Sequence, residues 1–87
     1  MNKDRRKALA KLVEQLSPLL SQIEDIKGEL ESIKDDEEAY KDAMPESLQS
    51  SERYSASETA VERLESAIEA LGSLDEVTDA IEEAAGQ

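Results

Sequence analysis

Apolar residues recur at heptad spacing through the first half of the chain. When Leu9 is assigned to position a, every a and d position up to Ile33 is leucine or isoleucine. The residues of this seam are Leu9, Leu12, Leu16, Leu19, Ile23, Ile26, Leu30 and Ile33. An unbroken a/d pattern of this length is typical of coiled-coil helices. The sequence therefore predicts a first helix over residues 3–42, with Glu37 ending the a series and Tyr40 continuing the d series into the core.

The stripe is widened at its N-terminal end and contains a proline. Val13 and Leu20 occupy e positions, and a stripe of that width suits a helical bundle better than a bare two-stranded seam. Pro18 removes one backbone donor from the helix. Because the heptad phase does not slip across Pro18, the pattern favours either a kinked helix or a helix restarted from a Ser17 cap along the same line.

The pattern stops over residues 43–51 and then resumes. Met44-Pro45 disfavours helix and starts a turn, so this segment is interpreted as the tip of a helical hairpin, with Met44 and Leu48 closing the end of the core. The second helix is expected over residues 52–85, beginning near Ser51 or at a Ser55/Glu58 capping box. Its predicted core residues are Val61, Leu64, Ile68 and Leu71.

The apolar phase slips after Leu71, which leaves the continuity of the second helix open. Gly72 could end one helix and Ser73 start another, since Ser73 and Glu76 form a second capping-box pattern. A continuous helix that tolerates one glycine at a cost of about 1 kcal/mol is equally compatible. In either case, long helices joined by a short connection pack most economically side by side. We therefore expect one all-α domain, residues 1–87, folded as an antiparallel, coiled-coil-like hairpin.

The composition suits helices but supports only a small core. Of the 87 residues, 38% are hydrophobic and 37% are charged, and Tyr40 and Tyr54 are the only aromatic residues. Burial of so little apolar surface barely offsets the entropy lost when the chain is ordered, and there is no cysteine to form a disulfide. Oligomerisation is then the expected source of additional stability. We expect a homo-oligomer, with a dimer that forms a four-helix bundle favoured.

The chain has a net charge of −12, and its charged residues are distributed unevenly along the sequence. Residues 3–11 contain five bases and one acid, whereas residues 64–87 contain seven acids and no base. Antiparallel packing would bring the two blocks together and offset the helix dipoles that each block opposes. The alternative is that the basic block is a solvated tail. Arg53 and Arg63, the only bases after Lys41, are expected to pair with nearby acids.

The chain lacks the residue types on which most catalytic and metal sites depend. It has no histidine and no cysteine, so it lacks the commonest general base, the commonest metal ligand and a thiolate. Its serines have no base to activate them, and its acids lack the spacing of a calcium loop. We expect no catalytic, cofactor-binding or metal site, and hence not an enzyme. A small ligand bound in the bundle core is the weakest functional alternative.

The acidic surface is the remaining candidate for function. Rows of carboxylates on helices can imitate a phosphate backbone and attract a basic groove on another protein. The acids nearest the tip, with one tyrosine, form the candidate partner-binding set: Asp35, Asp36, Glu37, Glu38, Glu46, Glu52 and Tyr54. The alternative is that the acids only keep a structural or assembly coiled coil in solution. Direct binding to nucleic acid or to a membrane surface is not expected, because both need a basic face, and no apolar run is long enough to span a bilayer.

The stretch from Ala39 to Arg53 resembles the central motif of small acidic helical proteins encoded by bacteriophages and prophages. The shared features are an aromatic residue before Met-Pro-Glu, a Leu-Gln pair, and a Ser-Glu-Arg that opens the second helix; here they are Tyr40, Met44-Pro45-Glu46, Leu48-Gln49 and Ser51-Glu52-Arg53. The resemblance implies a cytoplasmic location in a bacterial host cell. By analogy, it implies an accessory or counter-defence protein that engages a host protein. The acidic surface makes a nucleic-acid-binding protein one candidate for that partner. It implies no site residues.

Overall fold

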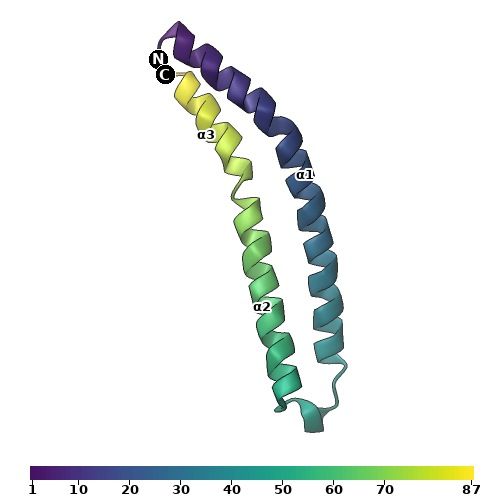
Figure 1. The fold of residues 1–87 in the computed structure, drawn as a ribbon. Helices are drawn as coiled ribbons and strands as arrows, with labels where there is room; N and C mark the ends of the chain where they lie inside the picture. The colour runs from purple at the N-terminus through teal and green to yellow at the C-terminus, as the bar shows by residue number, and fades with distance from the viewer.

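The computed structural model describes all 87 residues and contains no strand. Its elements are α1 (Lys3–Asp42), a short 3-10 turn (Glu46–Leu48), α2 (Glu52–Gly72) and α3 (Asp75–Ala85). Figure 1 shows α2 and α3 returning alongside α1, so that the two chain termini lie at the same end of the molecule. The all-α class predicted from the heptad pattern is confirmed.

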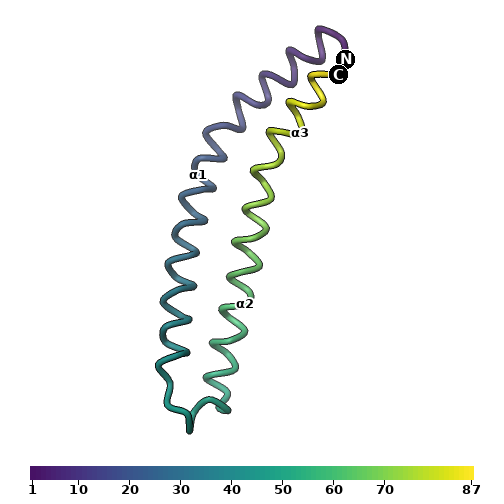
Figure 2. Tube along the Cα trace, turned by 180° about the vertical axis from the view of Figure 1, so that it is seen from behind, coloured from purple at the N-terminus to yellow at the C-terminus, as the bar shows by residue number.

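Helix α1 runs without interruption through Pro18. At its start, the Asn2 side-chain oxygen accepts a hydrogen bond from the backbone N–H of Arg5 at 2.8 Å, which satisfies one of the free donors of the first turn. Ser17 does not start a new helix, because one missing donor leaves the other bonds of a 40-residue helix in place. The molecule has two arms, α1 and the returning arm formed by α2 and α3. Both arms curve in the same sense along their length, as Figure 2 shows from behind.

The contact between the arms selects a different stripe of α1 from the a/d seam. Apart from Glu38, the residues from the start of α1 to Met44 that are not exposed recur at alternating intervals of four and three: Leu9, Val13, Leu16, Leu20, Ile23, Lys27, Leu30, Lys34, Glu37, Lys41 and Met44. These are the a and e positions, which we call the inner row of α1. The wide stripe makes this possible, because Val13 and Leu20 continue as Lys27, Lys34 and Lys41, whose apolar stems can lie against the other arm.

The d positions of α1 are exposed in the single chain. Between 47% and 55% of the surface of each is accessible to solvent, for Leu12, Leu19, Ile26, Ile33 and Tyr40. Tyr40 is therefore not a core residue of the single chain, and half of the predicted seam faces outward. The reason is geometric: one neighbouring arm covers one stripe of a helix, and the a/d and a/e stripes lie on different sides of the a positions.

The second arm begins at a serine cap. The Ser51 hydroxyl accepts a hydrogen bond from the backbone N–H of Tyr54 at 3.3 Å and donates one to the Leu48 carbonyl at 2.6 Å. Of the two starts left open by the sequence, the one near Ser51 is therefore right, and the capping box at Ser55 is wrong. At the tip, Met44 is buried, whereas Leu48 is 48% exposed and does not close the core.

A tightened turn separates α2 from α3. The backbone N–H groups of Leu74, Glu76 and Val77 each donate to the carbonyl three residues earlier, which is the 3-10 pattern. The inner row of this arm is Tyr54, Ser57, Val61, Leu64, Ile68, Leu71, Leu74, Thr78, Ile81 and Ala85. The intervals from Ile68 to Leu71 and from Leu71 to Leu74 are both three, and this departure from alternation overwinds a helix.

The capping residues expected from the sequence do not cause the break between α2 and α3. Gly72 remains in α2 and has no positive φ, so it provides no left-handed cap. Ser73 does not cap α3 either; its hydroxyl donates to the Glu69 carbonyl at 3.4 Å, and the residue before α3 is Leu74, without a side-chain cap. The spacing of the apolar residues, which must continue to face α1, accounts for the break.

The molecule is elongated and buries little of itself. It measures 66 × 19 × 13 Å, and its radius of gyration is 19.7 Å, against about 12 Å for a compact chain of this length. Only Met44, Ser57 and Val61 are buried. The accessible surface is 6480 Å², whereas a compact monomer of this mass exposes about 5,100 Å². The single chain thus leaves an unusually large surface in contact with water.

One side-chain hydrogen bond joins the two arms. The hydroxyl of Ser57, which is 4% exposed, donates to a carboxylate oxygen of Glu37 at 2.6 Å. We expect Glu37→Ala to lower the free energy of unfolding by about 1–3 kcal/mol, because it leaves a buried hydroxyl without a partner. Urea unfolding followed by circular dichroism measures this loss.

The matched control is Glu31→Ala, which removes an exposed acid from the same helix and is expected to change stability by less than about 0.5 kcal/mol. Adding Ser57→Ala to Glu37→Ala should recover part of the loss, since the orphaned hydroxyl is then removed. Equal effects of Glu37→Ala and Glu31→Ala would show that the hydrogen bond does not stabilise the paired arms.

Candidate functional site

A shallow hollow between α1 and α2 places residues of both arms on one side of the molecule. The hollow has a volume of about 320 Å³ and is lined by Glu31, Lys34, Asp35, Glu65, Ile68 and Glu69. Each of its four acids follows an inner-row residue by one position; Glu31, for example, follows Leu30, and Glu65 follows Leu64. Residues that follow the inner row therefore lie on the same side on both arms.

A second hollow obeys the same rule further along the arms. Its volume is about 310 Å³, and its lining residues are Ala10, Val13, Glu14, Ile81, Glu82 and Ala85. Ala10, Glu14 and Glu82 each follow an inner-row residue. The rule thus holds both between α1 and α2 and between α1 and α3, so this side extends along most of the molecule.

The side defined in this way is strongly acidic, and we call it the acidic side. Thirteen of the 22 acidic residues follow the inner row, and no lysine or arginine does so. The acids are Glu14, Glu24, Glu31, Asp35, Glu38, Asp42, Glu58, Glu62, Glu65, Glu69, Asp75, Asp79 and Glu82. Carboxylates on both arms therefore flank the same line of contact, where they repel one another.

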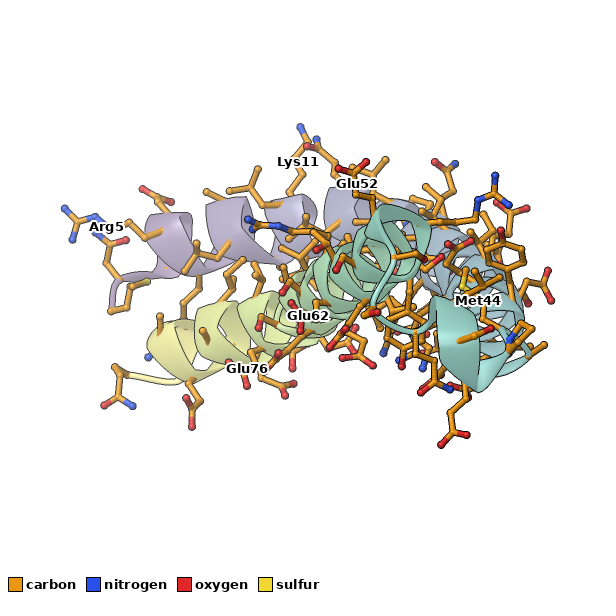
Figure 3. The ribbon with its side chains drawn as sticks, turned by 90° about the horizontal axis from the view of Figure 1, so that it is seen from below. Arg5, Lys11, Met44, Glu52, Glu62 and Glu76 are labelled. Carbon is orange, nitrogen blue, oxygen red and sulfur yellow. The ribbon has the colours of Figure 1, made fainter.

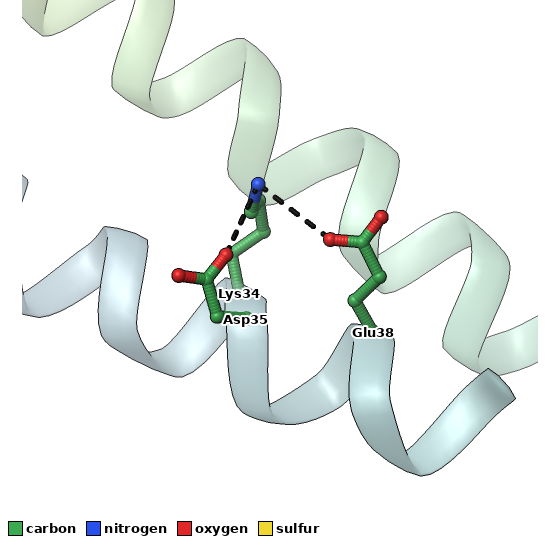
Figure 4. Close-up of polar contacts among 3 residues, drawn as sticks. All are labelled: Lys34, Asp35 and Glu38. Carbon is green, nitrogen blue, oxygen red and sulfur yellow. Dashed lines mark ion pairs between the residues drawn. The ribbon is translucent and has the colours of Figure 1, made fainter. Parts of the chain in front are cut away.

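Lys34 is the cation that lies among these carboxylates. Its Nζ is 3.3 Å from Asp35 Oδ1 and 3.7 Å from Glu38 Oε2, and these are the two ion pairs of the molecule (Figure 4). The hydrogen bond to Asp35 raises the pKa of Lys34 above its ordinary value, and the charges of Asp35, Glu38 and Glu65 add to this effect against a smaller lowering by desolvation. Lys34 therefore remains charged at neutral pH, pairs with two acids of α1, and offsets the charge of Glu65 on α2.

The structure divides the predicted partner-binding set. Asp35 and Glu38 pair with Lys34, and Glu37 accepts the hydrogen bond from Ser57 instead of facing solvent. Tyr54 is half-buried, with the Nζ of Lys41 6.0 Å from the centre of its ring. Exposed acids without an ion pair make up the rest of the set: Asp36, Glu46 and Glu52.

The basic and acidic blocks share one end of the molecule but form no ion pair. Figure 3 shows Arg5 and Lys11 on α1 pointing away from Glu76 on α3. Arg53 and Arg63 also have no ionic partner, contrary to expectation. Antiparallel packing thus places the two blocks near each other without direct pairing.

The residues missed by the sequence analysis are polar members of the inner rows. Lys34 and Ser57 are polar, whereas a heptad pattern predicts core positions from apolar residues. A signal was present in the sequence, because Lys27, Lys34 and Lys41 repeat at heptad spacing and continue the row of Val13 and Leu20.

No three acidic side chains come together in a way that would hold a metal ion. None of the helices combines the length and apolar character that crossing a bilayer requires. Comparison with known proteins gives no match: no family model, no curated sequence and no solved structure is similar to the chain. The geometry of its surfaces is therefore the basis for assigning a function.

Replacing Lys34 tests whether it holds the acidic side together. We expect Lys34→Gln to lower the midpoint of thermal unfolding, because the charges of Asp35, Glu38 and Glu65 then repel without compensation. The loss should be larger in about 0.01 M salt than in about 1 M salt, since the screening length falls from about 30 Å to about 3 Å. Circular dichroism on heating measures the midpoint.

The control is Lys11→Gln, which removes an exposed cation without an ionic partner. The raised pKa also predicts a pH dependence: the contribution of Lys34 is complete at neutral pH and disappears as the pH rises above 10.5, where the amine loses its proton. Midpoints that fall equally for the two variants at both salt concentrations would rule out a specific role for Lys34.

Proposed function

We propose that the chain is a non-catalytic protein-binding module, built as a helical hairpin, whose acidic side engages a basic surface on a partner protein. The observation that carries this proposal is the gathering of thirteen acids on one side of both arms, with Lys34 as the one cation that reaches them through an ion pair. Most of these carboxylates have no counterion within the chain, so their charge is available to a partner.

The regular rows of acids suit a partner that binds nucleic acid. Glu24, Glu31 and Glu38 repeat every seven residues along α1, and seven residues rise by about 10 Å in a helix. Rows of negative charge on two neighbouring rods present a potential like that of a phosphate backbone. Such a potential accelerates the approach of a basic groove and weakens as salt is added.

The resemblance of Ala39 to Arg53 to phage-encoded proteins adds a biological setting to this proposal. In that setting, the module is an accessory or counter-defence protein in the cytoplasm of a bacterial cell, and its partner is a host protein. This part rests on the motif and on analogy, whereas the protein-binding role rests on the acidic side.

A second candidate function is that of a structural or assembly coiled coil. The observation that favours it is the row of five exposed d residues on α1, from Leu12 to Tyr40. On this view, the chain works by self-association, as a dimer with four helices, and its acids serve solubility. The two candidates differ in the surface that they require, so neutralising acids tests the first and leaves the second unaffected.

Neutralising the acidic side tests its role in binding. A variant with four acids replaced by glutamine is compared with a variant in which four exposed acids elsewhere are neutralised. The first set is Glu31, Glu58, Glu65 and Glu69. The control set is Asp4, Asp25, Glu76 and Glu83. Both variants have the same net charge, so only the position of the lost carboxylates differs.

Proteins captured by the immobilised chain from a bacterial lysate provide the readout. We expect a basic nucleic-acid-binding protein to be retained by the parent and the control variant, and to be lost from the acidic-side variant. We also expect it to elute as salt rises to about 1 M, where the screening length is about 3 Å. Capture that persists at that salt concentration, or equal loss from both variants, would contradict recognition by the acidic side.

A further inference from the structure

The side opposite the acidic side is apolar. Because residues that follow the inner rows lie on the acidic side, the residues that precede them lie on the opposite side of both arms. Large members of this set stand on α1 and are Leu12, Leu19, Ile26, Ile33 and Tyr40. Smaller members stand on the returning arm and are Ala56, Ala60, Ala67, Ala70, Val77, Ala80 and Ala84. We call this surface the apolar side.

Charged residues are sparse on the apolar side. Along the inner rows they are Glu29 and Asp36 on α1, and Arg53 and Arg63 on α2. Eight large apolar residues of the chain are exposed, and six of these belong to the apolar side. The other two are Met1 at the chain end and Leu48 at the tip. Exposed apolar surface is therefore concentrated on one side of the molecule, and such contiguous patches mark interaction surfaces.

We propose that a second copy of this chain covers the apolar side, so that two copies form a four-helix bundle with both acidic sides facing outward. This inference does not depend on the acidic side binding a partner. The proposed interface differs from the a/d seam because it uses both arms. The a and e residues of α1 hold the two arms of one chain together, whereas the d residues of α1 form the contact between the two copies.

The exposed area of the single chain matches what a dimer would cover. The accessible surface of 6480 Å² exceeds that of a compact monomer of this mass by about 1,400 Å². A standard interface covers about 800 Å² on each partner, and permanent homodimers cover more. The broad sides of the molecule run along its 66 Å length, which provides room for an interface of this size.

The sizes of the side chains indicate how the copies meet. A two-fold axis parallel to the arms places α1 of one copy over α2 and α3 of the other, with both tips at the same end. The row of large residues on α1 then faces the row of alanines on the other copy, and large residues against small ones pack without gaps. The same surface is used twice, as a two-fold dimer requires.

The charges on the apolar side agree with this axis. Ser57 lies opposite Glu37, so Arg63, six residues further along α2, is level with position 31 of α1. Rotation about an axis parallel to the arms keeps these levels, and it brings Arg63 of one copy between Glu29 and Asp36 of the other. Arg63 has no ionic partner within its own chain. An axis across the arms would place α1 on α1 and leave these charges apart.

The second arginine gives an independent agreement. Arg53 lies four residues before Ser57 and is therefore level with Lys41, beside Tyr40. In the proposed dimer, Arg53 of one copy reaches Tyr40 of the other, an aromatic side chain that is 47% exposed in the single chain. Arginine stacks favourably on tyrosine, so both unpaired arginines of α2 acquire partners.

Sedimentation equilibrium of two variants, substituted at neighbouring positions, tests the proposal. Ala67→Glu places a carboxylate on the apolar side, whereas Ser66→Glu places the same charge one residue away, outside it. Both positions are exposed in the single chain, so neither substitution disturbs the contact between the arms. We expect the parent and Ser66→Glu to sediment as dimers and Ala67→Glu to sediment as a monomer.

Circular dichroism over a range of protein concentrations distinguishes a variant that has lost the dimer from one that is unfolded for another reason. If Ala67→Glu loses helix on dilution while Ser66→Glu retains it, the dimer stabilises the fold and the proposal stands. A monomeric parent at all concentrations, or a dimeric Ala67→Glu, would overturn it. The acidic-side variant described above should remain dimeric, so this proposal and the proposed function fail separately.

Introduced cysteines test the axis, because the chain has none of its own. Ile33 is level with Val61, which makes Ala60 of the other copy its expected neighbour. An oxidised mixture of Ile33→Cys and Ala60→Cys chains should form mainly the mixed disulfide. Disulfides formed mainly between two Ile33→Cys chains would place α1 on α1 and overturn the proposed arrangement.

Discussion

The contact between the inner rows of the two arms is the interaction on which the rest of the structure depends. Each helix carries one row, and the rows are in contact from Leu9 beside α3 to Met44 at the tip. The half nearer the termini is apolar except for Thr78, and the half nearer the tip mixes lysines, Glu37 and Ser57 with apolar residues. Pairing one row with one row leaves the remaining faces of both helices open, so the identity of the inner row determines what the molecule presents outside.

Polar residues within this contact give the arms a defined register. Apolar rows alone tolerate sliding, because leucine and isoleucine at different levels are nearly equivalent. The hydrogen bond from Ser57 to Glu37 joins the two arms and is therefore specific to one level. The Lys34 ion pairs are partly exposed and add little stability on their own, but they offset repulsion where carboxylates of the two arms approach.

Register in turn separates two chemically different sides. Residues before and after each inner residue point in opposite directions, so the same repeat collects carboxylates on one side and leucine, isoleucine and alanine on the other. The two proposals follow from this separation, one for each side. If copies pair through the apolar sides, the acidic sides remain outward and free, so self-association and partner binding are compatible within one assembly.

Much of the architecture was determined by the sequence alone. Heptad spacing predicted a first helix over residues 3–42, and α1 occupies that span; Met44-Pro45 predicted the turn that follows. The phase slip after Leu71 marked the place where the second arm could break. The tertiary structure alone decided which stripe of α1 meets the other arm, how Ser57 and Glu37 pair, and that the second arm does break there. The physical reason is that periodicity specifies the angles between side chains around a helix, whereas the neighbour that each stripe meets depends on a second helix whose own phase shifts at Leu74.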